Sequence, residues 1–137
     1  MNDECHILIV DDEEGQRMLL GEVMRDMGHD VQTGADGFEA LSQVKLGFDL
    51  VLLDAQMPGM DGFEVLRRLR EEPEHADLPV ILVTGLDDPD YRQRAVEAGA
   101  DDFISKPIEP EELKLRVSSI LRRAAKTARQ GENDERI

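Results

Sequence analysis

A chain of 137 residues, of which 40% are hydrophobic and 34% charged, has the length and composition of a single globular domain. Its 31 acidic and 16 basic residues give a formal net charge of −15, so the surface repels nucleic acid and argues against DNA as a direct ligand. The longest apolar runs are far shorter than a bilayer-spanning helix, which argues against a membrane protein.

Strand-like apolar segments alternate with helical patterns five times, which is typical of βα units that build a parallel sheet covered on both faces. The sequence predicts strands at residues 6–10, 31–33, 50–53, 80–84 and 102–104. The first, third and fourth are nearly all aliphatic, as buried central strands must be, whereas the other two are more polar and are expected nearer the edges. We therefore predict an α/β fold of the flavodoxin-like, doubly wound type, with five parallel strands in the order 2-1-3-4-5 and five helices.

The helical segments carry apolar residues at the spacing of one helix face, which predicts that this face packs on the sheet. The second helix is expected to run from Asp36, in the N-cap position, to a stop at Gly47. The last helix begins after Pro110, and its apolar pattern continues only weakly toward the end of the chain. The sequence thus predicts one domain over residues 1–123, followed at 124–137 by a helical extension, a linker or a disordered tail.

Polar side chains gather at the ends of the predicted strands. Asp11 and Asp12 follow the first strand and Asp54 follows the third. Thr84 ends the fourth strand, and Lys106 comes shortly after the fifth. Parallel strands bring their carboxyl ends to one edge of a sheet, and ligands bind there at the point where the strand order reverses. In the order 2-1-3-4-5 the third strand lies between the first and the fourth, so these side chains are expected to meet.

This set of residues predicts a magnesium-dependent phosphoryl site. Three neighbouring carboxylates repel one another by roughly a few kcal/mol per pair, which a bound Mg²⁺ ion with oxygen ligands would relieve. Mg²⁺ also commonly bridges carboxylates to phosphate oxygens. Phosphoryl transfer needs a nucleophile, a metal ion and groups that bind the remaining oxygens, and Asp54, Mg²⁺, Lys106 and Thr84 would supply one of each.

Four motifs of the chain resemble those of the receiver domain of bacterial two-component response regulators, and the resemblance covers about residues 5–123. They lie at the strand ends described above and in the turns that follow them. In chain order they are Ile9-Val10-Asp11-Asp12-Glu13, Leu52-Leu53-Asp54-Ala55-Gln56-Met57-Pro58-Gly59-Met60-Asp61-Gly62, Val83-Thr84-Gly85 and Asp102-Phe103-Ile104-Ser105-Lys106-Pro107.

The resemblance assigns roles to individual residues. It implies that Asp54 takes a phosphoryl group from a phosphohistidine of a partner kinase. It also implies that Mg²⁺ is held by Asp11, Asp12, Asp54 and the backbone carbonyl of Gln56. Thr84 and Phe103 are expected to form the switch, with Lys106 binding the phosphoryl group, and the peptide bond between Lys106 and Pro107 is expected to be cis.

The resemblance also implies the kind of protein and its partners. We expect a phosphoacceptor signalling switch that is not an enzyme but assists its own phosphorylation and dephosphorylation. The expected partners are a sensor histidine kinase or phosphotransfer protein and a downstream protein target or output domain. A homodimer through the face made by helix four, strand five and helix five is also expected to be possible. The acidic start of the chain and the single cysteine, Cys5, favour a cytoplasmic location.

Alternative functions follow from the same residues. Asp11 and Asp12 could simply cap the next helix, and the chain could be a receiver-like interaction module that is never phosphorylated. An aspartyl-phosphate phosphatase of the haloacid dehalogenase type needs its nucleophile after strand one and a second aspartate two positions on, where this chain has Glu13. A flavin-binding flavodoxin is disfavoured because the acidic residues after strand one would repel the flavin phosphate.

Overall fold

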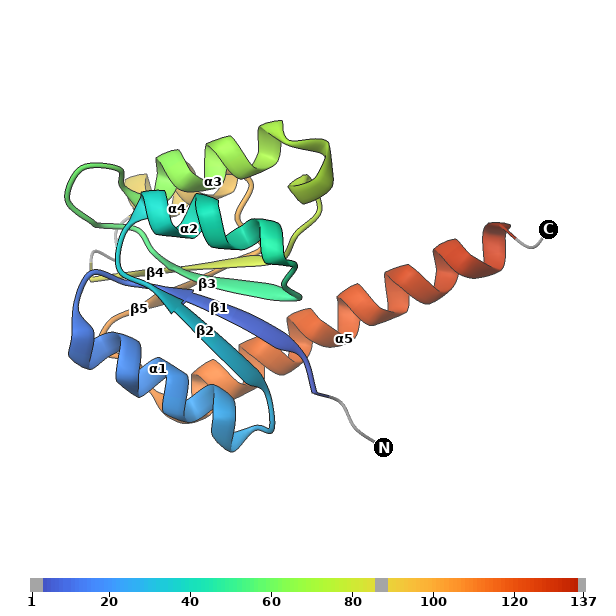
Figure 1. Cartoon of the computed structure of the whole chain (residues 1–137), viewed down its shortest axis with the longest axis horizontal. Helices are drawn as coiled ribbons and strands as arrows, with labels where there is room; N and C mark the ends of the chain where they lie inside the picture. Colours follow the sequence, from blue (N-terminus) through green and yellow to red (C-terminus); the bar gives the residue numbers. More distant parts are fainter. Residues whose placement is uncertain (1–3, 86–88, 136–137) are drawn as a thin grey trace.

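The structure is a computed structural model that describes residues 4–85 and 89–135, with side chains described up to Lys126 (Figure 1). Five parallel strands form one sheet in the order β2-β1-β3-β4-β5. The strands are β1 His6–Val10, β2 Asp30–Gly34, β3 Leu50–Asp54, β4 Val80–Thr84 and β5 Asp102–Ser105. The helices are α1 Glu14–Asp26, α2 Gly37–Gln43, α3 Gly62–Glu71, α4 Pro89–Ala98 and α5 Pro110–Glu135, with short 3₁₀ helices η1 Val44–Leu46 and η2 Pro73–His75. The predicted fold class and strand order are confirmed.

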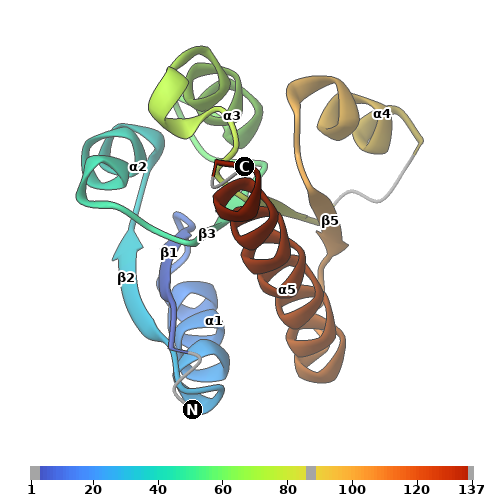
Figure 2. The ribbon, with the colours of Figure 1, turned by 90° about the vertical axis from the view of Figure 1, so that its right-hand side faces the viewer.

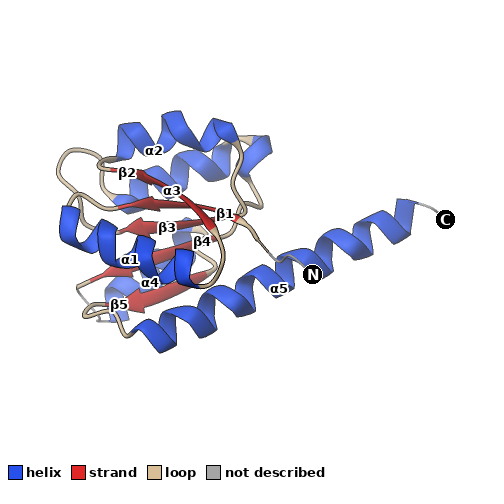
Figure 3. Ribbon diagram, turned by 60° about the horizontal axis from the view of Figure 1, so that its bottom comes forward, coloured by secondary structure: helices blue, strands red, loops and turns tan. Residues whose placement is uncertain are grey.

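Helices cover both faces of the sheet. α1 and α5 lie on one face, and α2, α3 and α4 lie on the other, as the end-on view shows (Figure 2). In the view coloured by secondary structure, α1 lies in front of the strands (Figure 3). Successive strand side chains point to opposite faces. In β1, for example, Ile7 and Ile9 pack with α1 and α5, while Leu8 and Val10 pack with α2 and α3. The central strands are therefore aliphatic along their length because each residue enters one of two cores.

The strand register sets the positions of the polar residues that follow. Val10 at the end of β1 lies opposite Leu53 of β3, so the next residue on each strand, Asp11 and Asp54, comes at the same level of the edge. On the other side of β3, Asp54 lies opposite Val83, one residue before Thr84. Each connecting helix returns the chain so that the next strand runs in the same direction. These polar side chains therefore all reach one rim of the sheet.

Local signals fix several helix ends, and two of them, Asp36 and Gly47, were predicted from the sequence. The Asp36 carboxylate accepts a hydrogen bond of 2.8 Å from the backbone N–H of Glu39, and Asp61 accepts one of 2.9 Å from Glu64. These bonds satisfy N–H groups that lack partners in the first helical turn. Gly47 follows η1 with a φ of 92°, a left-handed conformation that glycine adopts without steric penalty.

The last helix, α5, runs well past the sheet. It projects from the edge opposite to the carboxyl ends of the strands, so its distal end lies far from the polar rim (Figure 1). The division of the chain at residue 123 remains a prediction. Within the described residues, no helix combines the length and the apolar character that crossing a bilayer requires.

Candidate functional site

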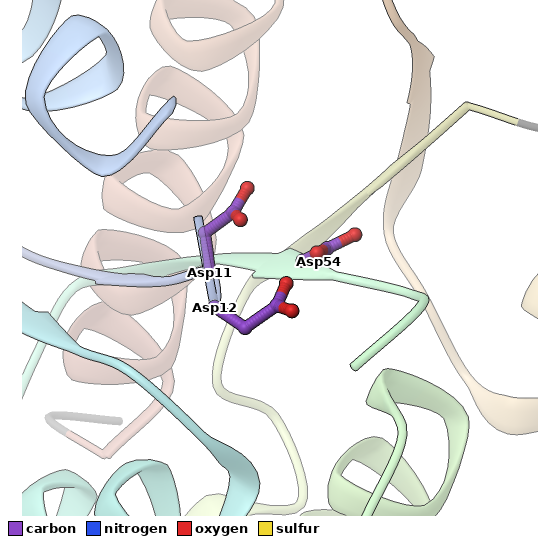
Figure 4. A group of neighbouring side chains, drawn as sticks. All are labelled: Asp11, Asp12 and Asp54. Carbon is purple, nitrogen blue, oxygen red and sulfur yellow. The ribbon is translucent and has the colours of Figure 1, made fainter. Parts of the chain in front are cut away.

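Three carboxylates converge at the rim of the sheet. Oxygen atoms of Asp11, Asp12 and Asp54 all lie within 4.8 Å of one another, and the side chains point toward a shared space (Figure 4). Asp11 and Asp12 come from the segment after β1, and Asp54 is the last residue of β3. The sequence-based expectation that these residues meet is confirmed in its geometry.

The Asp54 carboxyl lies in surroundings that disfavour its negative charge. Its side chain is only 3% exposed. The pKa of Asp54 is raised from 3.8 to about 6, chiefly by burial and in addition by the neighbouring Asp11 charge and a hydrogen bond with Asp12. The backbone N–H of Gln56, which donates to Asp54 Oδ1 at 3.2 Å, and the ammonium of Lys106 act in the opposite direction. Asp54 thus sits where its negative charge is poorly compensated.

Lys106 is the cation nearest to these carboxylates among the described residues. Its Nζ lies 3.5 Å from Asp11 Oδ2 and 3.6 Å from Asp54 Oδ1, distances of ion pairs rather than of close hydrogen bonds. Lys106 reaches the site because Ser105 pairs with Thr84 in the β4–β5 register, so the next residue stands at the rim. The peptide bond from Lys106 to Pro107 is cis, as predicted.

The donor set fits a hard divalent cation. Asp11 Oδ2 is buried and makes no hydrogen bond, although most buried polar atoms in proteins have a partner. The atoms of Asp11, Asp12 and Asp54 that face one another are all carboxylate oxygens, the ligands that Mg²⁺ prefers. A bound cation would satisfy the Asp11 oxygen that lacks a hydrogen bond, favour the ionised form of Asp54 and reduce the repulsion among the three carboxylates.

The loop after β3 is folded back against the end of that strand. The backbone N–H of Gly62 donates to the carbonyl of Ala55 at 3.0 Å, which closes the loop at the start of α3. A Cβ atom at Gly62 would lie 2.3 Å from the carbonyl oxygen of Asp54. This close approach keeps Asp54 and Gln56 in a fixed relation to the first turn of α3.

Thr84 and Phe103 occupy different environments. Thr84 is fully buried at the end of β4, one residue beyond the position opposite Asp54. Phe103 lies in β5 opposite Leu82 and is partly buried against the core. It lines a cavity of about 500 Å³ against α4 and α5, together with Val96 and Arg116. The structure therefore brings Asp11, Asp12, Asp54 and Lys106 together, while Phe103 belongs to a neighbouring surface.

Two contacts at the site went unnoticed in the sequence. Arg17 of α1 donates from Nη1 to the carbonyl oxygen of Asp11 at 2.7 Å and thereby helps to orient the segment that carries two of the carboxylates. In the sequence, Arg17 is recognisable only as a basic residue in the second turn of a helix that begins with an acidic residue. The close approach of Gly62 to Asp54 had as its one sequence signal the glycine itself, which lacks the Cβ atom that would collide with the Asp54 carbonyl oxygen.

Comparison with known proteins matches the chain to one family. The family model described as the response regulator receiver domain matches residues 7–118, which include all five strands except His6 of β1 and all four converging side chains. The chain belongs to the response regulator receiver domain family. The receiver domain shares 46% identity over 119 residues with the cyclic di-GMP phosphodiesterase response regulator RpfG of Xanthomonas campestris, covering 85% of this chain and 32% of that protein.

Two further similarities are consistent with this assignment. The receiver domain is 40% identical over 126 residues to the transcriptional regulatory protein ResD of Bacillus subtilis, covering 91% of this chain and 51% of ResD. The structure of the chemotaxis protein CheY4 of Vibrio cholerae is similar at a TM-score of 0.82 and 30% identity, covering 85% of this chain and 98% of CheY4. The chain therefore spans about a third to a half of the length of the two curated relatives, RpfG and ResD. Receiver domains are signalling modules.

Proposed function

We propose that this receiver domain works as a magnesium-dependent phosphorylation switch in which Asp54 accepts a phosphoryl group. The observation that carries the proposal is the convergence of Asp11, Asp12 and Lys106 on the buried Asp54 carboxylate. A carboxylate with uncompensated charge at the rim of a parallel sheet is suited to bind a cation and to attack a phosphorus atom. Structural stability alone offers no reason to gather three carboxylates there.

The transfer itself exchanges one bond to phosphorus for another. An oxygen of Asp54 forms a bond to phosphorus while the P–N bond of a phosphohistidine on the partner kinase breaks. The imidazole nitrogen keeps the electron pair of that bond and is protonated from solvent. Hydrolysis later returns the Asp54 carboxylate and releases inorganic phosphate. None of the described residues needs to act as a proton donor to the leaving imidazole.

The residues around Asp54 divide the remaining tasks. Asp11, Asp12, Asp54 and the backbone carbonyl of Gln56 would hold Mg²⁺, which neutralises charge on the phosphoryl oxygens when bound. Lys106 presents its ammonium on a long stem beside Asp54, where it would bind one phosphoryl oxygen. Thr84 would donate a hydrogen bond to another oxygen, and Phe103 would repack in response.

Phosphorylation would change the contacts around Asp54 more than it would change the net charge of the site. It adds about −1.5 to −2 charges beside a cation and an ammonium that largely balance them. Moving a two-state equilibrium from 1:99 to 99:1 requires about 5.5 kcal/mol of differential binding, which contacts to the metal ion, Lys106 and Thr84 together would have to supply. We infer that the face made by α4, β5 and α5 carries this change to a downstream protein, an output domain or a second copy of the chain.

Incubation with Mg²⁺ and a small acyl phosphate tests the phosphoacceptor directly. The wild-type protein is expected to gain one phosphoryl group by intact mass, and Asp54→Ala is expected to gain none, because Asp54 is the proposed nucleophile on which Asp11, Asp12 and Lys106 converge. Asp26→Asn, which removes a carboxylate from the surface of α1 with 73% exposure, is the matched control and should be modified normally. Absence of the adduct from the wild-type protein would favour an interaction module that is never phosphorylated.

Replacing Lys106 separates phosphorylation from switching. Lys106→Ala is expected to keep Mg²⁺ binding, because the ammonium repels the cation, and to accept phosphate while losing most of the response in β5 and α4. Titration calorimetry measures the Mg²⁺ affinity, and backbone amide chemical shifts before and after phosphorylation measure the response. Lys114→Ala serves as the control because its ammonium pairs with Asp26 on the surface. A full response in Lys106→Ala would refute the role assigned to this lysine.

A further inference from the structure

Helix α4 is held by few buried side chains. Ala95 is the one buried residue of α4 in the described part of the chain, whereas α3 buries five residues. Because burial of apolar side chains supplies most of the free energy that holds a helix on a sheet, α4 is the more easily displaced of the two. A specific contact between α4 and a neighbouring element therefore contributes strongly to the position of α4.

One such contact joins α4 to the start of α3. The guanidinium carbon of Arg94 lies 4.1 Å from the ring centroid of Phe63 and 5.4 Å from that of Tyr91. The two rings also meet, with centroids 5.9 Å apart and planes inclined by 52°. These three residues form what we call the α3–α4 clasp. A cation over an aromatic face within about 6 Å of its centroid is attracted by the ring quadrupole.

The clasp is connected to the phosphoacceptor through α3. Phe63 is only 8% exposed and follows Gly62, whose backbone lies against the carbonyl group of Asp54. Arg94, on the other side of the ring, is an exposed side chain of α4. The clasp thus links the end of β3 to α4 along a path that does not pass through Thr84.

We propose that the α3–α4 clasp holds α4 in the position of the unphosphorylated domain, with Arg94 as the positioning residue whose release lets α4 move. The proposal rests on the proposed function for its regulatory consequence, but not for the mechanical role of the clasp. A contact present in one state and lost in the other biases the equilibrium toward the first. Loss of Arg94 should therefore make the switched state easier to reach.

Hydrogen exchange tests the mechanical role without phosphate or metal. In protein treated with a chelator, Arg94→Ala is expected to exchange the amides of α4 about two- to fivefold faster than the wild type, as expected for the loss of one exposed cation–π contact. Arg94→Lys should fall between them, because an ammonium lacks the flat guanidinium surface. Arg92→Ala, which removes the same side chain from the same helix at the α5-facing cavity, is the matched control.

The outcomes separate clearly. Faster exchange in Arg94→Ala but not in Arg92→Ala supports the clasp. The higher helix propensity of alanine would slow the exchange of α4, so helix propensity cannot account for faster exchange. Unchanged exchange, or an equal increase in Arg92→Ala, overturns the proposal.

Phosphorylation kinetics test the regulatory consequence. With Mg²⁺ and a small acyl phosphate, Arg94→Ala is expected to become modified about two- to fivefold faster than the wild type, because the apparent rate follows the fraction of protein in the competent state. An equal or slower rate overturns the regulatory role. If the wild-type protein takes up no phosphate at all, the proposed function fails, while the exchange experiment still decides the role of the clasp.

Discussion

The Asp54→Asn variant is expected to be more stable than the wild type at neutral pH in the absence of metal, by up to about 3 kcal/mol of unfolding free energy. Burial, as the largest cause, raises the pKa of Asp54 from 3.8 to about 6, so the fold disfavours the ionised carboxylate. A difference of about two pKa units corresponds to about 3 kcal/mol between the two protonation states. Asparagine occupies a similar volume without the charge and escapes this penalty.

The sign of the pH dependence follows from the two pKa values. Below about pH 4 the Asp54 carboxyl is protonated in both folded and unfolded chains, and the penalty is absent. Between 3.8 and about 6 the unfolded chain loses this proton before the folded one, so wild-type stability falls as the pH rises. Above about pH 6 the penalty is complete and constant. The stability gap between Asp54→Asn and wild type should thus fall to about half by pH 5.

Urea unfolding of chelator-treated protein at pH 7.5 and pH 5 measures this gap. Asp26→Asn removes a carboxylate that is 73% exposed and should show no comparable stabilisation. Added Mg²⁺ should raise the stability of the wild type and narrow its gap to Asp54→Asn, because a bound cation favours the ionised carboxylate. Equal stabilities of wild type and Asp54→Asn at both pH values would contradict the assigned burial penalty.

The cost of burying a charged carboxylate also explains why the site could be predicted from the sequence. A charged residue at the end of a strand as apolar as β3 gains nothing from burial, so its position argues for a ligand. Parallel topology then brings together Asp11, Asp54 and Lys106, which lie far apart in the chain. Strand order and site were predictable together because both follow from where each aliphatic run ends.

The ends of the strands were less predictable. β2 extends from Asp30 to Gly34 instead of the predicted 31–33, and β3 and β5 end at Asp54 and Ser105, one residue beyond the predicted 50–53 and 102–104. Backbone pairing continues there through polar residues that carry no apolar signal.

Contacts between side chains that are distant in the sequence could not be predicted, because they leave no periodic pattern in it. Phe63 and Arg94 come from consecutive helices, and each is compatible with an ordinary surface or core position. Only the packing of α3 beside α4 brings the guanidinium over the ring. The ion-pair distances of Lys106 and the orphan oxygen of Asp11 are likewise properties of packing that motif spacing does not determine.

Gly62→Ala is expected to damage both the stability and the site, because the new methyl group has no space. Its Cβ would lie 2.3 Å from the Asp54 carbonyl oxygen and 2.8 Å from Ala55 Cα, and both neighbours are backbone atoms that cannot rotate away. Either α3 or the end of β3 must shift. Overpacking of this kind typically lowers the unfolding free energy by about 1–3 kcal/mol, and contact with backbone places this variant toward the upper end.

Gly15→Ala is a matched control for this substitution. Gly15 is an exposed residue of α1, and a Cβ there would meet nothing within 4 Å, so the change should stabilise the domain by about 0.5–1 kcal/mol through helix propensity. Urea unfolding gives the stabilities, and calorimetric titration gives the Mg²⁺ affinity. Because the backbone of Gly62 lies against the carbonyl group of Asp54, Mg²⁺ affinity should fall in Gly62→Ala and remain unchanged in Gly15→Ala. If both variants bound Mg²⁺ like the wild type, α3 would have to absorb the displacement alone, and the fixed relation between Gly62 and Asp54 would be wrong.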